Sequence, residues 1–109
     1  MIEPAGVTDL DREEIKQGLA DGSILLVDVR EPHEFAAGHI PGSISRPLST
    51  FDPGDLPVHP GRRIVFSCAA GVRSVRAIEL AQDAGLPMSE HYGGGFKDWL
   101  HAGEAVEET

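Results

Sequence analysis

Two short runs of mostly apolar residues, 24–29 and 63–67, constrain the fold of this 109-residue chain more than any other feature. A strand with one face in water alternates apolar and polar residues, whereas these runs read Ile-Leu-Leu-Val-Asp-Val and Arg-Ile-Val-Phe-Ser. Such continuous runs are typical of strands buried on both faces of a parallel sheet. Parallel neighbours must be joined by a crossover, usually a helix. The runs therefore predict an α/β fold.

The segment before the first run has the layout of a helix start. Asp11 is a suitable N-cap, and Glu14 falls at the third helical position, where it can complete a capping box. Leu10 can pack on Ile15 as a hydrophobic staple. The pattern predicts a helix that runs to about residue 20 and ends at Gly22.

Helix and strand signals then alternate along the rest of the chain. The predicted elements are a short helix from Pro32 to Gly38, a weak strand over 43–45, a loop over 52–61, a helix from Ser74 to Gly85, a strand over 89–92 and a short helix through Trp99. This alternation predicts a mostly parallel sheet with right-handed crossovers, sandwiched by helices.

Length and charge limit the organisation of the chain and its partners. We expect residues 1–109 to form a single domain, with a core over about 8–103 and an acidic tail over 104–109 that frays. Eighteen acidic and nine basic residues give a formal net charge of −9. Nucleic acid and anionic membranes would repel such a chain, so neither is expected as a partner. No apolar run approaches the roughly 18 residues of a membrane span.

Two further absences bear on location and cofactors. Residues 1–4 lack the basic and then apolar layout of a secretory signal, so we expect a cytoplasmic protein. Cys68 is the single cysteine and has no internal disulfide partner, and neither a Cys-x-x-Cys nor a His-x3-His spacing occurs. We therefore expect no structural zinc site.

The second apolar run leads into a turn of small residues and the start of a helix. The segment reads Cys68-Ala69-Ala70-Gly71-Val72-Arg73-Ser74. Ligands of open α/β sheets bind at such strand-to-helix junctions, where converging backbone N–H groups favour a thiolate over a thiol. Gly71 permits a backbone shape that other residues resist, and Arg73 supplies a fixed positive charge. We predict that Cys68 is partly exposed and that its pKa lies below that of a free thiol.

A lone cysteine at the end of a strand is also common as a small buried apolar residue without chemistry. The small residues around it and the arginine five positions later favour a nucleophile instead. From the local pattern alone, the two interpretations remain evenly balanced.

The pattern Cys68-x-x-Gly71-x-Arg73-Ser74 resembles the active-site loop of the single-domain rhodaneses, which are sulfurtransferases. Three further blocks are similar to signatures of that family and follow in the same order. They are Asp28-Val29-Arg30-Glu31 with Glu34-Phe35, then Gly38-His39-Ile40-Pro41-Gly42, and finally Gly94-Gly95-Phe96-Lys97-Asp98-Trp99. The resemblance covers about residues 8–103 and implies a three-layer α/β/α fold with a mostly parallel five-stranded sheet.

The resemblance also implies a reaction. The Cys68 thiolate takes sulfane sulfur from a donor such as thiosulfate or a persulfide, and a thiol or cyanide then discharges the resulting persulfide in a double displacement. Such a reaction needs neither a metal nor an organic cofactor. The donor or the acceptor can itself be a protein. The residues that bind the transferred sulfur, mainly through backbone N–H groups, are Ala69, Ala70, Gly71, Val72, Arg73 and Ser74.

The sulfur donor and the roles of two arginines are left open by the sequence. Ala69 stands where thiosulfate-using members often carry a basic residue, which leaves a protein or low-molecular-weight persulfide as an alternative donor. Arg46 stands where the family often has an apolar residue, and we interpret it as a solvated surface charge rather than an anion ligand. The sequence does not decide whether Arg73 contacts the substrate or braces the loop.

Two other functions compete with sulfur transfer. Phosphatases and arsenate reductases of related architecture carry a Cys-x5-Arg loop, whereas Cys68 and Arg73 form the shorter Cys-x4-Arg. Non-catalytic interaction modules of the family usually lack the cysteine, which is present here. Sulfur transfer is therefore the leading hypothesis.

Several other polar and aromatic residues are predicted to be structural. We expect Asp28, Arg30 and Glu31 to brace the fold, and His39 to make a structural hydrogen bond. Trp99 should pack the last helix on the sheet. The remaining histidines lack metal-like spacing: His33, His59, His91 and His101.

Overall fold

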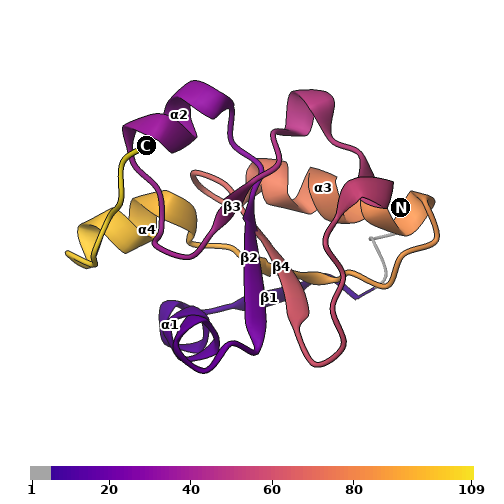
Figure 1. The fold of residues 1–109 in the computed structure, drawn as a ribbon, viewed down its shortest axis with the longest axis horizontal. Coiled ribbons are helices and arrows are strands. Elements are labelled where there is room, and N and C mark those ends of the chain that lie inside the picture. The colour runs from indigo at the N-terminus through magenta and orange to yellow at the C-terminus, as the bar shows by residue number, and fades with distance from the viewer. Residues whose placement is uncertain (1–5) are drawn as a thin grey trace.

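A five-stranded, all-parallel sheet in the order β1-β5-β4-β2-β3 organises the computed structural model, which describes residues 6–109 (Figure 1). The strands are β1 (Thr8–Leu10), β2 (Ile24–Asp28), β3 (Ile44–Ser45), β4 (Arg63–Ser67) and β5 (Glu90–Tyr92). The helices are α1 (Arg12–Asp21), α2 (Pro32–Ala37), α3 (Val72–Asp83) and α4 (Gly95–His101), with 3-10 turns at Leu48–Thr50 and Pro53–Asp55. The predicted α/β class is confirmed. Residues 1–4, which carried the expectation about location, lie outside the described residues.

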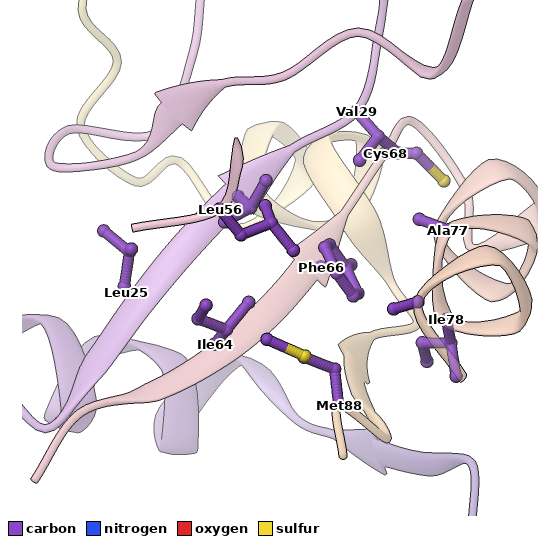
Figure 2. Packing of buried hydrophobic residues seen from close by; sticks show 11 residues of the cluster. Leu25, Val29, Leu56, Ile64, Phe66, Cys68, Ala77, Ile78 and Met88 are labelled. Atoms are coloured by element: carbon purple, nitrogen blue, oxygen red, sulfur yellow. The ribbon is translucent and has the colours of Figure 1, made fainter. Parts of the chain in front are cut away.

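The sheet is buried on both faces, as the two apolar runs predict. All five residues of β2 are buried, and its side chains alternate between two apolar clusters. One cluster joins Leu25 and Phe66 to Ile78 of α3 (Figure 2). The other joins Leu26 to α1 and to Trp99 of α4, which confirms the packing role expected of Trp99. Thus α3 covers one face of the sheet, and α1 and α4 cover the other (Figure 1).

α1 begins and ends as predicted. The Asp11 carboxylate accepts the N–H of Glu14 at 2.9 Å, and the Glu14 carboxylate accepts the N–H of Asp11 at 3.0 Å. Gly22 ends the helix with a φ of 79°. Leu10 and Ile15 are buried in the same cluster, as a hydrophobic staple requires. No helix within residues 6–109 is long and apolar enough to cross a membrane.

β1 is missing from the sequence-based prediction. Only Leu10 of its three residues is buried, so no apolar run marks the strand. Its backbone pairs in parallel with β5, from Thr8 beside Glu90 to Leu10 beside Tyr92. Pairing with a distant strand, rather than side-chain pattern, makes this segment a strand.

The prediction that the acidic tail frays is wrong. The backbones of His39 and Glu107 exchange two hydrogen bonds, of 2.8 and 3.0 Å, and the N–H of Thr109 donates to a carbonyl of α2 at 3.0 Å. The Trp99 indole N–H also donates to the carbonyl oxygen of Ala105 at 2.7 Å. The acidic composition describes only side chains, whereas backbone groups fasten this segment to the domain.

Candidate active site

Cys68 is the first residue after β4, at the carboxyl edge of the sheet, and its side chain points toward α3 (Figure 2). α3 begins at Val72, ahead of the predicted start at Ser74, so the end of the predicted loop is the first helical turn. The Val72 side chain is exposed, whereas Ser74 is buried. Gly71 has a φ of 89°, and a Cβ there would lie 2.6 Å from the Gly93 carbonyl oxygen, so glycine is required.

The sulfur of Cys68 is surrounded by hydrogen-bond donors. The backbone N–H groups of Gly71 and Ser74 point at Sγ with N–S distances of 3.1 and 3.4 Å, and the Ser74 hydroxyl oxygen lies 3.6 Å away. Burial raises the pKa of the Cys68 thiol, but the Ser74 hydroxyl and the N–H groups of Ser74, Ala70 and Gly71 together lower it by more. The pKa therefore lies below that of an ordinary thiol, as predicted, and the arrangement favours the nucleophilic thiolate.

The prediction that Cys68 is partly exposed is wrong. Its side chain belongs to the apolar cluster beneath α3, and the residue is 1% exposed. The loop closes over the sulfur because the N–H groups of Gly71 and Ser74 are directed inward at Sγ.

The start of α4 holds the outer side of the loop. The N–H of Phe96 donates to the Cys68 carbonyl oxygen at 2.8 Å, and the N–H of Lys97 donates to the Ala69 carbonyl oxygen at 3.1 Å. These bonds turn the loop carbonyls toward α4 and leave loop N–H groups facing the sulfur. Gly95 permits the close approach, because a Cβ there would lie 2.5 Å from the Ala69 carbonyl oxygen.

Arg73 binds α2. Its guanidinium forms a two-bond ion pair with the Glu34 carboxylate, at 2.7 and 3.1 Å. Hydrogen bonds from Arg73 lower the pKa of Glu34 from 4.5 to about 2, against the opposing effect of burial. On the question that the sequence left open, the geometry favours a bracing role for Arg73.

The other charged residues of the predicted motifs make structural contacts, as expected. Arg30 forms a buried ion pair with Asp28 at 2.7 Å. Glu31 accepts a hydrogen bond from the Ser49 hydroxyl at 2.6 Å. Nδ1 of His39 lies 2.9 Å from a backbone carbonyl oxygen of α2. The contacts of Glu31 and His39 lie at the two ends of α2, the helix that carries Glu34.

Arg46 is also engaged by neighbouring groups. Its Nη1 donates to the Ser45 carbonyl oxygen at 2.9 Å, and its Nε lies 3.7 Å from the Asp55 carboxylate. The side chain is 36% exposed. Its Nε is buried and has no hydrogen-bond partner among residues 6–109, so Arg46 is not the fully solvated surface charge that the sequence suggests.

His91 is the residue that the sequence analysis missed. Its Nδ1 lies 2.8 Å from the Ser74 hydroxyl oxygen, and both residues are buried. Within residues 6–109, no group of His, Cys, Asp or Glu side chains is arranged to hold a metal ion. The sequence carried no signal for this contact, because alternation along the strand indicates only that His91 and Tyr92 face opposite sides of the sheet. Spacing typical of metal ligands does not reveal a histidine whose role is a buried hydrogen bond.

Comparisons with known proteins place these features in a family. Residues 11–102 match the family described as the Rhodanese-like domain. The chain is 40% identical to the mouse thiosulfate sulfurtransferase/rhodanese-like domain-containing protein 3, over 89% of this chain and 69% of that protein. It is 30% identical to the human thiosulfate:glutathione sulfurtransferase, over 88% of this chain and 96% of that protein. The solved structure of the human single-domain sulfurtransferase TSTD1 is similar, with a TM-score of 0.73 and 30% identity over 88% of this chain and 97% of that one.

Proposed function

The chain belongs to the Rhodanese-like domain family, and from this premise we propose that it is a sulfurtransferase in which Cys68 carries the transferred sulfur as a persulfide. The observation that carries the proposal is the pair of backbone N–H groups, of Gly71 and Ser74, that donate to Sγ, with the Ser74 hydroxyl oxygen 3.6 Å from the sulfur. Donors that favour a thiolate also stabilise the negative charge of a persulfide. The related sulfurtransferases support the same chemistry.

The reaction consists of two displacements. In the first, the Cys68 thiolate attacks the outer sulfur of the donor; when the donor is thiosulfate, its S–S bond breaks and sulfite leaves with the electron pair. In the second, a thiolate or cyanide attacks the outer sulfur of the persulfide, and Cys68 leaves as the thiolate. The donors around Sγ stabilise the attacking group of the first step and the leaving group of the second.

Two observations bear on the identity of the donor. The human relative is named for thiosulfate and glutathione, which supports thiosulfate as a donor and a thiol as an acceptor. However, Ala69 carries no charge, and the Arg73 guanidinium is bound by Glu34. A persulfide on a small molecule or on a protein therefore stays within the proposal as an alternative donor.

Mass spectrometry of the intact protein tests the proposal. After incubation with thiosulfate or with glutathione persulfide, we expect Cys68 to gain the mass of one sulfur atom and to lose it on addition of glutathione or cyanide. A non-catalytic interaction module would gain no mass with either donor. A phosphatase would instead hydrolyse an aryl phosphate, with turnover that Cys68→Ser removes, and that result would overturn the assignment.

Arg73→Ala is expected to slow sulfur transfer from an anionic and from a neutral donor equally. It should also lower the free energy of unfolding by about 1–2 kcal/mol, because a charge-assisted contact between α3 and α2 is lost. Glu34→Gln is the matched variant and should have the same effects. The stabilisation by the pair should be present above pH 4.5 and should fade as the pH falls toward about 2, where Glu34 becomes protonated in the folded protein.

Thermal unfolding and initial rates with both donors measure these effects. If Arg73→Ala lowered the rate with thiosulfate only and left the free energy of unfolding unchanged, Arg73 would be shown to contact the substrate.

A further inference from the structure

Three buried residues form a hydrogen-bonded chain that ends at the sulfur: His91 on β5, Ser74 in α3 and Cys68 after β4. Nδ1 of His91 lies 2.8 Å from Oγ of Ser74, which lies 3.6 Å from Sγ. The three residues are 7%, 0% and 1% exposed, so water competes little for these groups. Neither displacement step of the proposed reaction uses His91.

The surroundings of His91 keep its ring neutral. On the neighbouring strand β1, the residue in register with it is Asp9, whose carboxylate accepts a backbone N–H at 2.7 Å. Glu90, the next residue in the chain, is paired with Arg63. Burial lowers the pKa of His91, and the charge of Asp9 acts weakly in the opposite direction. Near pH 7 the ring therefore carries one proton, either on Nδ1 or on Nε2.

The protonation state of Cys68 determines which ring nitrogen carries that proton. The Ser74 hydroxyl has one hydrogen and lies between Sγ and Nδ1. When Cys68 is a thiolate, the hydroxyl donates to Sγ, and its oxygen accepts from Nδ1–H. When Cys68 is a thiol, S–H donates to Oγ, and the hydroxyl donates to an unprotonated Nδ1, so that the ring proton is on Nε2. Ionisation thus releases the thiol proton to water and moves the ring proton from Nε2 to Nδ1 by exchange with water.

We propose that His91 is a positioning residue: as the Nδ1–H tautomer it directs the Ser74 hydroxyl at Cys68 and so favours the thiolate and the persulfide. The backbone N–H groups of Gly71 and Ser74 already donate to Sγ and so favour the thiolate. The thiolate is the state of Cys68 that requires the Nδ1–H tautomer of His91. Without a donor at position 91, the Ser74 hydroxyl loses the contact that holds its hydrogen toward the sulfur. The inference rests on the proposed function, since stabilising the thiolate affects the reaction only if Cys68 is the nucleophile.

The pH dependence of Cys68 alkylation by iodoacetamide tests the inference. In His91→Phe, which has no ring N–H, we expect the midpoint to rise by about one pH unit and the rate near pH 7 to fall about tenfold. In His91→Asn, the amide N–H can replace Nδ1–H and should restore most of the rate. His39→Phe is the matched control, because His39 is also a buried histidine (8% exposed) hydrogen-bonded through Nδ1, and its midpoint should not change. An unchanged midpoint in folded His91→Phe would overturn the inference.

Nitrogen NMR of the unsubstituted protein provides a second measurement that does not depend on a variant folding. The ¹⁵N shifts of the His91 ring should report the Nδ1–H tautomer above the Cys68 midpoint and the Nε2–H tautomer below it. In Cys68→Ser, that switch should disappear. A ring that stays in the Nε2–H form throughout would overturn the inference. Neither measurement needs sulfur transfer, so a failure to form a persulfide would refute the proposed function separately.

Discussion

Replacing Cys68 with serine is expected to abolish sulfur transfer while leaving the fold in place. A hydroxyl is similar in size and can accept the hydrogen bonds of Gly71 and Ser74, but an oxygen at this position cannot form a persulfide. Cys68 is the single cysteine of the chain, so no other thiol can take over. The rate of thiocyanate formation from thiosulfate and cyanide should fall to the rate without enzyme, and the Tm should stay close to that of the parent protein.

A thiol moved by one residue is the matched control. Ser67 is buried like Cys68, but adjacent residues at the end of a strand face opposite sides of the sheet. The double substitution Ser67→Cys with Cys68→Ser therefore keeps one thiol in the chain, away from the donors of the loop. Transfer should remain lost. Activity in this double variant, or in Cys68→Ser alone, would show that the nucleophile is not defined by the donors around Sγ.

Gly95→Ala is expected to reduce sulfur transfer on the order of a hundredfold, because it displaces the loop that surrounds Cys68. A Cβ at Gly95 would lie 2.5 and 2.6 Å from the carbonyl oxygens of Ala69 and Cys68, and backbone atoms can relieve such a clash only by moving the loop. A shift of the loop would move its N–H groups away from Sγ. Overpacking of this kind should also lower the free energy of unfolding by roughly 1–3 kcal/mol.

Gly103→Ala is the control that distinguishes the effect of the steric clash at Gly95 from the effect of backbone strain. Gly103 has a φ of 72°, similar to the 65° of Gly95, but a Cβ there would meet nothing within 4 Å. Both variants therefore carry a similar cost of about 1–2 kcal/mol for a left-handed alanine. Only Gly95→Ala should lose transfer activity and raise the pH midpoint of Cys68 alkylation. Equal activities of the two variants would contradict the proposal that α4 holds the loop.

Sequence patterns were sufficient to predict elements whose conformation is determined by a short stretch of chain. The runs at 24–29 and 63–67 predicted β2 and β4, and the capping residues Asp11 and Gly22 predicted the ends of α1. The order of Cys68, Gly71 and Ser74 predicted a strand, a turn and a helix with N–H groups directed at a thiol. These inferences succeed because periodicity, capping and strand-to-helix junctions involve residues that are close together in the chain.

The tertiary structure alone decided which distant groups meet. It paired Arg73 with Glu34, 39 positions away, and placed His91 beside Ser74, 17 positions away. It also buried Cys68, whose small side chain carries no pattern that distinguishes a covered sulfur from an open one. These contacts depend on the order and register of strands and on which face of the sheet each side chain occupies. A local stretch of sequence does not contain that information, because the residues that complete each contact lie elsewhere in the chain.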